Sequence, residues 1–375
     1  MSLLYFDHAA TTPVKDEVLQ EMLPYFTNNF GNPSSIYSIG RRSKKAVENA
    51  RTKVAKAIGC QEKEIYFTSC GSESDNLAVK GVAFANKNKG NHIITSKIEH
   101  PAILNTCKNL EENGFEVTYL NVDENGFIDL QELKNSIKPE TILISIMFAN
   151  NEIGTIQPIK EISKIAKDSE IIFHTDCVQA VGNVKIDVNK FGIDLLSMSA
   201  HKFYGPKGIG ALYVRNGIEF TRIQDGGHQE KNKRAGTENV AGIVGLGKAI
   251  EIADNNLENY NSKLLKLRNY FIREITSKYD NVKINGDLKQ RLPGNINISF
   301  PGVDAEELLL KLDNQGICAS AGSACSSGST QPSHVLTAIG LSEEYATGSL
   351  RITLGEENTI DDVKFLINCI EKILG

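Results

Sequence analysis

Helical and strand-like patterns alternate over the first two thirds of the chain. A helix that begins at Thr12-Pro13 is expected to continue to residue 26, and an amphipathic stretch over 40–59 should end at Gly59. Short apolar runs, mostly separated by segments with helical spacing, predict buried strands at 64–69, 92–96, 115–122, 141–148, 171–176 and 194–200. Strands that alternate with crossover helices predict an α/β fold with a mostly parallel sheet.

The pattern changes after about residue 255. A long charged helix is expected over 261–279, and two strand-like runs and two further helices follow it, at 295–300, 349–355, 304–315 and 359–373. These elements predict a smaller α+β domain. We therefore expect a large domain over 13–255 and a small domain formed by 1–12 together with 256–375.

Composition and charge narrow the classes of function. With 375 residues, of which 41% are hydrophobic, the chain can bury a full core, and its net charge of -5 argues against a nucleic-acid-binding surface. No apolar run approaches the roughly 18 residues of a membrane span, and the first residues lack the basic and apolar regions of a secretion signal. These observations predict a cytoplasmic protein that binds neither nucleic acid nor a membrane.

The cysteines predict neither disulfides nor a structural metal site. Seven cysteines without a CxxC pair suit neither a disulfide framework nor zinc, so we expect reduced thiols. Cys325 stands out because the segment 320–330 otherwise contains only Ser, Ala, Gly and Thr. With two glycines and no large apolar side chain to anchor it, this segment is predicted to be a mobile loop. Its thiol lacks the apolar neighbours of a core cysteine.

Two polar motifs follow predicted strands, where ligands bind in open α/β sheets. The tripeptide CGS at 70–72 leads into a helix expected near Glu73. Gly71 permits close approach, and Ser72 with the N–H groups of the helix start would make a phosphate seat, although such turns are also common without a ligand. Asp176 ends a very apolar strand; it must meet a cation or several donors there, or else cap a helix.

The third motif surrounds Lys202. This lysine follows a strand, lies beside His201 and precedes a turn rich in Gly and Pro. Most lysines are solvated and inert, but an amine enclosed between buried strands can act as a nucleophile toward carbonyls. A phosphate seat, an acid for a ring nitrogen and an amine for a Schiff base together predict binding of pyridoxal 5'-phosphate.

Ten segments resemble the cysteine desulfurases of the NifS/IscS type. They are DHAATTP (7–13), GNPSS (31–35), FTSCGSESDN (67–76), EHPAI (99–103), NNEIG (150–154), HTDCVQ (174–179), SAHKFYGPKG (199–208), RAGTEN (234–239), GSACSSGS (322–329) and LRITLG (350–355). The match is collinear over essentially the whole chain. This family belongs to the class V aminotransferases, so the resemblance implies the fold type I architecture of pyridoxal-phosphate-dependent transferases. That architecture has a large domain with a mostly parallel seven-stranded sheet flanked by helices, plus a smaller α+β domain.

The resemblance also implies roles for individual residues at the cofactor. Lys202 would bind the cofactor covalently, Asp176 would face its ring nitrogen, and Gln179 would contact its ring hydroxyl. His100 would stack on the ring and move protons, or else only begin a helix before Pro101. The phosphate would be held by Gly71, Ser72, Ser199, His201 and, from a second subunit, Thr237. The enzyme is therefore expected to be a homodimer.

Substrate and chemistry follow from the same resemblance. Asn150, which would also contact the cofactor, and Arg351 would receive the substrate carboxylate; the alternative for Arg351 is a surface residue. With L-cysteine as substrate, Cys325 would attack its sulfur and take it as a persulfide, and L-alanine would leave. His100 is the predicted group that helps to form the Cys325 thiolate.

The sulfur acceptor implied by the family is a scaffold protein for iron–sulfur cluster assembly, and Cys325 could transiently ligate a nascent cluster. A sulfur donor for tRNA thiolation and a selenocysteine lyase are the alternatives. The motif CGS at 70–72 replaces the Gly-Ala-Thr of some relatives, with the hydroxyl of Ser72 in place of that of threonine. His8 and Cys177 receive no role from the sequence.

Overall fold

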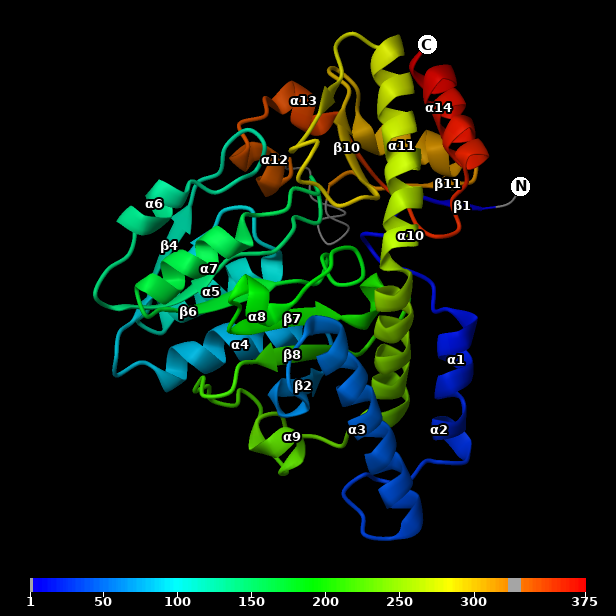
Figure 1. Cartoon of the computed structure of the whole chain (residues 1–375). Helices are drawn as coiled ribbons and strands as arrows, with labels where there is room; N and C mark the ends of the chain where they lie inside the picture. The colour runs from blue at the N-terminus through cyan, green and yellow to red at the C-terminus, as the bar shows by residue number, and fades with distance from the viewer. Residues whose placement is uncertain (1–2, 323–331) are drawn as a thin grey trace.

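A large sheet covered by helices and a smaller lobe share one long helix in the computed structural model, which describes residues 3–322 and 332–375 (Figure 1). The strands of the large sheet lie in the order β2 (Ile65–Thr68), β8 (Gly210–Val214), β7 (Leu195–Ser199), β6 (Ile172–Asp176), β5 (Thr141–Ser145), β3 (His92–Ser96) and β4 (Glu116–Leu120). β8 is antiparallel to both of its neighbours, and the remaining pairs are parallel. The predicted mostly parallel seven-stranded sheet is confirmed.

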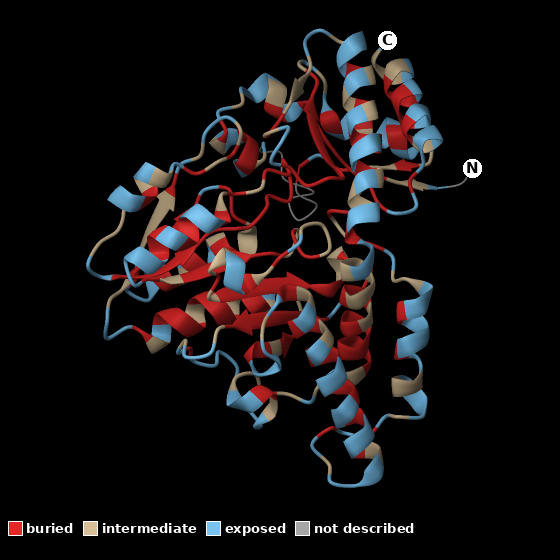
Figure 2. Ribbon diagram, viewed as in Figure 1, coloured by how far each residue is buried: buried red, intermediate tan, exposed pale blue. Residues whose placement is uncertain are grey.

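Helices cover both faces of this sheet. One face packs against α3 (Ser38–Ile58), α7 (Ile159–Asp168) and the first half of α10 (Val240–Lys278); the other packs against α4 (Gly71–Ala85) and α5 (Pro101–Glu112). Consecutive strand residues therefore enter different cores, and Figure 2 shows the strands buried while the outer sides of the helices are exposed. Burial on both faces explains why these strands are continuously apolar.

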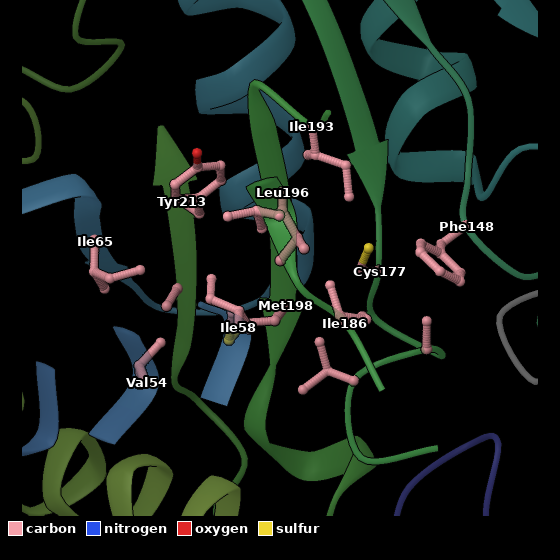
Figure 3. Packing of buried hydrophobic residues seen from close by; sticks show 14 of the residues in the cluster. Val54, Ile58, Ile65, Phe148, Cys177, Ile186, Ile193, Leu196, Met198 and Tyr213 are labelled. Atoms are coloured by element: carbon pink, nitrogen blue, oxygen red, sulfur yellow. The ribbon is translucent and has the colours of Figure 1, made fainter. Parts of the chain in front are cut away.

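Cys177 belongs to the core beneath α3. Figure 3 shows its sulfur among apolar side chains that include Leu196 and Met198 of β7, and the residue is fully buried. Burial raises the pKa of this thiol well above its ordinary value. Cys177 therefore acts as a small apolar side chain in the packed interior.

The first helix differs from its prediction. Instead of one helix from Pro13 to residue 26, the chain forms α1 (Asp16–Met22) and α2 (Pro24–Thr27). Thr12 cannot cap a helix because its N–H donates to the carbonyl of His201 and its hydroxyl accepts from the N–H of Tyr204. The short remaining elements of this part are η1 (Glu62–Glu64), α6 (Leu130–Asn135), α8 (Val188–Phe191), η2 (Ala200–Lys202) and α9 (Gln229–Asn232).

The smaller lobe contains an antiparallel sheet with helices. Its strands are β12 (Ser349–Thr353), β10 (Asn295–Ser299) and β9 (Lys283–Ile284), and its helices are α11 (Ala305–Asp313), α12 (His334–Ala338), α13 (Glu343–Thr347) and α14 (Ile360–Leu374). The N-terminal strand β1 (Leu4–Tyr5) joins this lobe by parallel pairing with β11 (Ile317–Cys318).

The domain boundaries stay a prediction, because α10 passes through residue 255 without a break. Its first half packs on the large sheet through Ile243 and Ile250, whereas Leu264 and Phe271 of its second half lie in the core of the smaller lobe. In the part of the chain that the structure describes, no helix has an apolar stretch long enough to cross a bilayer.

Candidate active site

A cavity of about 210 Å³ lies at the carboxyl ends of β3, β5, β6 and β7. It collects most of the residues that the sequence analysis singled out: Gly71, Ser72, His100, Asp176, Gln179, Ser199, His201, Lys202 and Arg351. These residues come from segments up to 280 positions apart, from Gly71 to Arg351. Most of them follow strand ends, which is where ligands bind in open α/β sheets.

The start of α4 provides the anion seat. α4 begins at Gly71, and a Cβ there would lie 2.6 Å from Cγ2 of Val178, so any larger residue would force Val178 to shift. The first N–H groups of a helix lack intrahelical partners and attract anions. The ring of His201 lies nearby and shares a hydrogen bond with the hydroxyl of Thr11 (3.1 Å). Burial lowers the pKa of His201 to about 4, with a smaller contribution from the charge of Lys202, so this imidazole is neutral at pH 7.

Asp176 reaches the cavity from the end of β6. Its Oδ1 accepts a hydrogen bond from the N–H of Val178 (2.8 Å), within a turn, and no helix of the described residues begins there. The alternative prediction that Asp176 caps a helix is therefore wrong. Burial raises the pKa of this carboxyl, while the charges of His100 and Lys202 oppose the rise.

Two further buried carboxyls near Asp176 escaped the sequence analysis. Asp75 lines the cavity, and burial, followed by the charge of Asp176, raises its pKa well above the ordinary value. Glu99 is fully buried; its Oε1 accepts from the hydroxyl of Ser96 (2.6 Å) and the N–H of Met147 (3.0 Å), and burial raises its pKa to about 8. Asp75 lies four positions after Gly71, so the helical spacing could have indicated it.

Lys202 is held by the N-terminal segment. Its Nζ donates to the carbonyls of Ala9 (2.5 Å) and Ala10 (2.8 Å), and the amide of Gln179 donates to the carbonyl of Ala9 (3.0 Å). His100 caps α5 and also lines the cavity, so the helix-start alternative is confirmed and its role at the cofactor stays a prediction. Its Nδ1 accepts from the N–H of Ala102 (3.1 Å), which leaves Nε2 as the nitrogen that can exchange a proton.

The carboxylate site differs in one residue from its prediction. Arg351 lines the cavity and is buried, so it is not a surface residue. Asn150, however, does not line the cavity. Its amide donates to the carbonyl of Ile98 (2.9 Å), and its Oδ1 accepts from the N–H of Glu152 (2.8 Å), because it shapes the loop after β5. The neighbouring Asn151 lines the cavity instead.

Thr237 and Cys325 are the remaining predicted residues. Thr237 is exposed on the surface before α10. Cys325 lies outside the described residues; the nearest described part of its segment includes Ser320, whose carbonyl accepts from the N–H of Arg351 (2.6 Å). Among residues 3–322 and 332–375, no group of three or more His, Cys, Asp or Glu side chains could hold a metal ion.

These side chains fit pyridoxal phosphate. The start of α4 at Gly71 leaves little room for a side chain and suits a phosphate. Asp176 is a buried acid for a ring nitrogen, and Lys202 supplies an amine on the same cavity. Fold and site together define a fold type I enzyme that depends on pyridoxal phosphate.

Comparison with known proteins supports this assignment to the enzymes that depend on pyridoxal phosphate. A family model described as Aminotransferase class-V matches residues 4–366. The chain is 58% identical over 373 residues to a protein named Cysteine desulfurase IscS from Clostridium botulinum, covering 99% of this chain and 94% of the relative. It is 57% identical over 371 residues to a protein of the same name from Methanosarcina thermophila, covering 99% and 92%.

Solved structures extend the similarity to three dimensions. A structure titled NIFS-LIKE PROTEIN has a TM-score of 0.94 at 39% identity, with 99% of each chain covered. Another, titled SspA in complex with cysteine, has a TM-score of 0.84 at 40% identity and covers 95% of this chain and all of the other. The chain belongs to the aminotransferase class-V family, and its relatives place it among the cysteine desulfurases of that family. The predicted family is confirmed.

Proposed function

We propose that this cysteine desulfurase removes sulfur from L-cysteine, releases L-alanine and keeps the sulfur on Cys325 as a persulfide. The observation that carries the proposal is the convergence of Lys202, Asp176, His100 and Arg351 on one cavity. When bound there, pyridoxal phosphate supplies an electron sink for the α-carbon of the amino acid.

Each cavity residue has a separate task in this proposal. Asp176 keeps the ring nitrogen of the cofactor protonated. Its carboxylate accepts one hydrogen bond from an N–H group and retains a lone pair to accept another from the protonated ring nitrogen. His100 exchanges protons at Nε2. Arg351 and Asn151, rather than Asn150, receive the substrate carboxylate, because both line the cavity and the guanidinium can form charge-assisted hydrogen bonds.

The sulfur would pass from the bound L-cysteine to Cys325, while the cofactor would supply the electron sink that lets the substrate bond break. The Cys325 thiolate attacks the sulfur of L-cysteine, an S–S bond forms, and the substrate bond between Cβ and sulfur breaks. The electron pair of that bond stays with the β-carbon, which takes up a proton to give L-alanine. Four residues lie between Cys325 and Ser320, whose carbonyl accepts from the N–H of Arg351, and the five steps from one Cα to the next span at most about 17 Å. In this proposal the thiol enters the cavity to take up the sulfur and leaves it to pass the sulfur on.

The test is the substitution Cys325→Ala in the cofactor-loaded protein. We expect unchanged visible absorbance of the cofactor and loss of sulfide and L-alanine formation from L-cysteine. Cys318→Ala, in the same lobe, is the matched control and should keep the activity. Full activity of Cys325→Ala would contradict the persulfide step.

We propose a homodimer as the working form. α2 and the segment after it expose several apolar side chains: Phe26, Phe30, Ile36 and Tyr37. Large exposed apolar side chains gathered in one region are typical of protein interfaces, and a second subunit would also bring the exposed Thr237 toward a neighbouring phosphate seat. Phe30→Glu should produce monomers in light scattering, whereas Leu310→Glu, at an exposed apolar position in the smaller lobe, should not.

We propose an iron–sulfur scaffold protein as the acceptor of the persulfide sulfur, with the support of the sequence resemblance. Enzyme loaded with 35S from labelled L-cysteine should pass the label to a purified scaffold protein. Retention of the label on the enzyme would contradict this assignment, and transfer to a tRNA-thiolating carrier instead would favour the alternative.

A further inference from the structure

Arg351 already forms an ion pair with a carboxylate of its own chain. Its NH2 lies 2.7 Å from Oδ1 of Asp7, and its NH1 donates to the carbonyl of Asn151 (3.3 Å). The side chain of Arg351 is 2% exposed and that of Asp7 is 14% exposed. Among the described residues, Nε of Arg351 has no hydrogen-bond partner although it is buried. The guanidinium is thus occupied on one side and keeps an unused donor.

The backbone around Asp7 is firmly held. The hydroxyl of Tyr5 lies 3.0 Å from the carbonyl oxygen of Asp7 and 3.1 Å from that of Thr11, and it can donate its one proton to either. The ring of His8 shares a hydrogen bond through Nδ1 with the carbonyl of Thr353 (2.9 Å), at the end of the strand that carries Arg351. His8, which received no role from the sequence, therefore fastens the N-terminal segment to β12. None of these bonds uses the Asp7 carboxylate, so the charge of Asp7 can be removed without breaking them.

We propose that Asp7 competes with the carboxylate of the bound amino acid for Arg351, and so keeps both substrate and product loosely bound. This inference rests on the proposed function, which assigns the substrate carboxylate to Arg351. Two carboxylates that share one guanidinium repel each other, and the repulsion is strong where water is excluded. Asp7 does not line the cavity, so it is a positioning residue that acts through Arg351. Its charge also offsets the cost of a buried arginine while the carboxylate site is empty.

The test compares L-alanine with L-alaninamide, in which a neutral amide replaces the carboxylate. Both are titrated calorimetrically into the cofactor-loaded wild type and into Asp7→Asn. We expect L-alanine to bind Asp7→Asn at least about tenfold more tightly and KM for L-cysteine to fall, while the affinity for L-alaninamide stays within about twofold. Unchanged or weaker binding of L-alanine would overturn the proposal, and so would equal tightening of both ligands.

Two further variants separate this inference from the function on which it rests. Arg351→Gln should weaken binding of L-alanine; if it does not, the proposed role of Arg351 fails. If Arg351→Gln weakens binding but Asp7→Asn does not tighten it, only the competition fails. Glu357→Gln is the matched control, since Glu357 pairs with His8 (3.2 Å) and not with Arg351, and it should leave the affinity for L-alanine within about twofold. Should Asp7→Asn fail to fold, Asp7→Ser removes the same charge and is subject to the same outcomes.

Discussion

Replacing Glu99 by glutamine should make the free energy of unfolding less sensitive to rising pH. Glu99 is fully buried beside the cavity; burial raises its pKa from 4.5 to about 8, although the hydrogen bonds from Ser96 and Met147 oppose the rise. In the unfolded chain, this carboxyl loses its proton near pH 4.5, whereas the folded protein keeps the proton up to about pH 8. Glutamine can accept the same two hydrogen bonds and has no proton to lose.

The magnitude follows from linkage between proton binding and unfolding. Between the two pKa values, the folded state binds one proton more than the unfolded state, so the free energy of unfolding falls as the pH rises. The slope is about 1.4 kcal/mol per pH unit, or about 3 kcal/mol from pH 5.5 to 7.5. The stabilising contribution of the Glu99 proton to the free energy of unfolding is fully present below pH 4.5 and is lost as the pH rises to about 8. Glu99→Gln removes this slope.

Urea unfolding of both proteins at pH 5.5, 6.5 and 7.5, at constant ionic strength and protein concentration, measures the difference. The free energy of unfolding of Glu99→Gln should gain about 3 kcal/mol relative to wild type over this range. For the control Glu73→Gln, the difference in free energy of unfolding from wild type should stay constant over the same pH range. Burial raises the pKa of Glu73, but hydrogen bonds from Arg234 and Ser69 outweigh it and lower the pKa, so its linkage lies below pH 4.5. A constant difference for Glu99→Gln as well would refute the reasoning.

Other substitutions have separate readouts. Gly71→Ala should weaken cofactor binding in equilibrium dialysis about tenfold, because its methyl would meet Val178, and adding Val178→Ala should restore part of the affinity. Arg51→Met leaves the buried carboxylate of Glu230 without its partner at 2.8 Å and should cost about 3 to 5 kcal/mol in urea unfolding, whereas adding Glu230→Leu should recover most of the loss. Cys177→Ala should lower stability by about 1 to 2 kcal/mol without changing the activity per folded molecule.

The strands of the large sheet were predictable because both of its faces are covered. Ile93 and Ile94 of β3 enter different cores, as do Leu195 and Leu196 of β7, so each strand forms a continuous apolar run. The helix start was not predictable to the same degree. Thr12 and Pro13 form a good local start signal, yet bonds from Thr12 to residues 201–204 keep the chain extended up to Lys15.

In the candidate site too, some residues were predictable from local sequence patterns and others depended on tertiary contacts. Gly71, Asp176 and Lys202 were found because each follows a predicted strand, and parallel strands bring their carboxyl ends to one edge of a sheet. The choice between Asn150 and Asn151 was beyond the sequence. Which of two adjacent side chains faces a cavity depends on the turn of the loop, and contacts with Ile98, some 50 residues earlier, decide that turn.

By itself, the sequence determined the sheet, the order of the chemical groups and the family, because periodicity and strand ends are local properties of the chain. Only the tertiary structure decided that Asp7 pairs with Arg351, that Glu99 and Asp75 are buried with raised pKa values, and that Cys177 is a core residue. The physical reason is that burial and charge pairing arise from contacts between segments far apart in the chain. The energy of an ionisable group follows from those contacts and not from its neighbours in sequence.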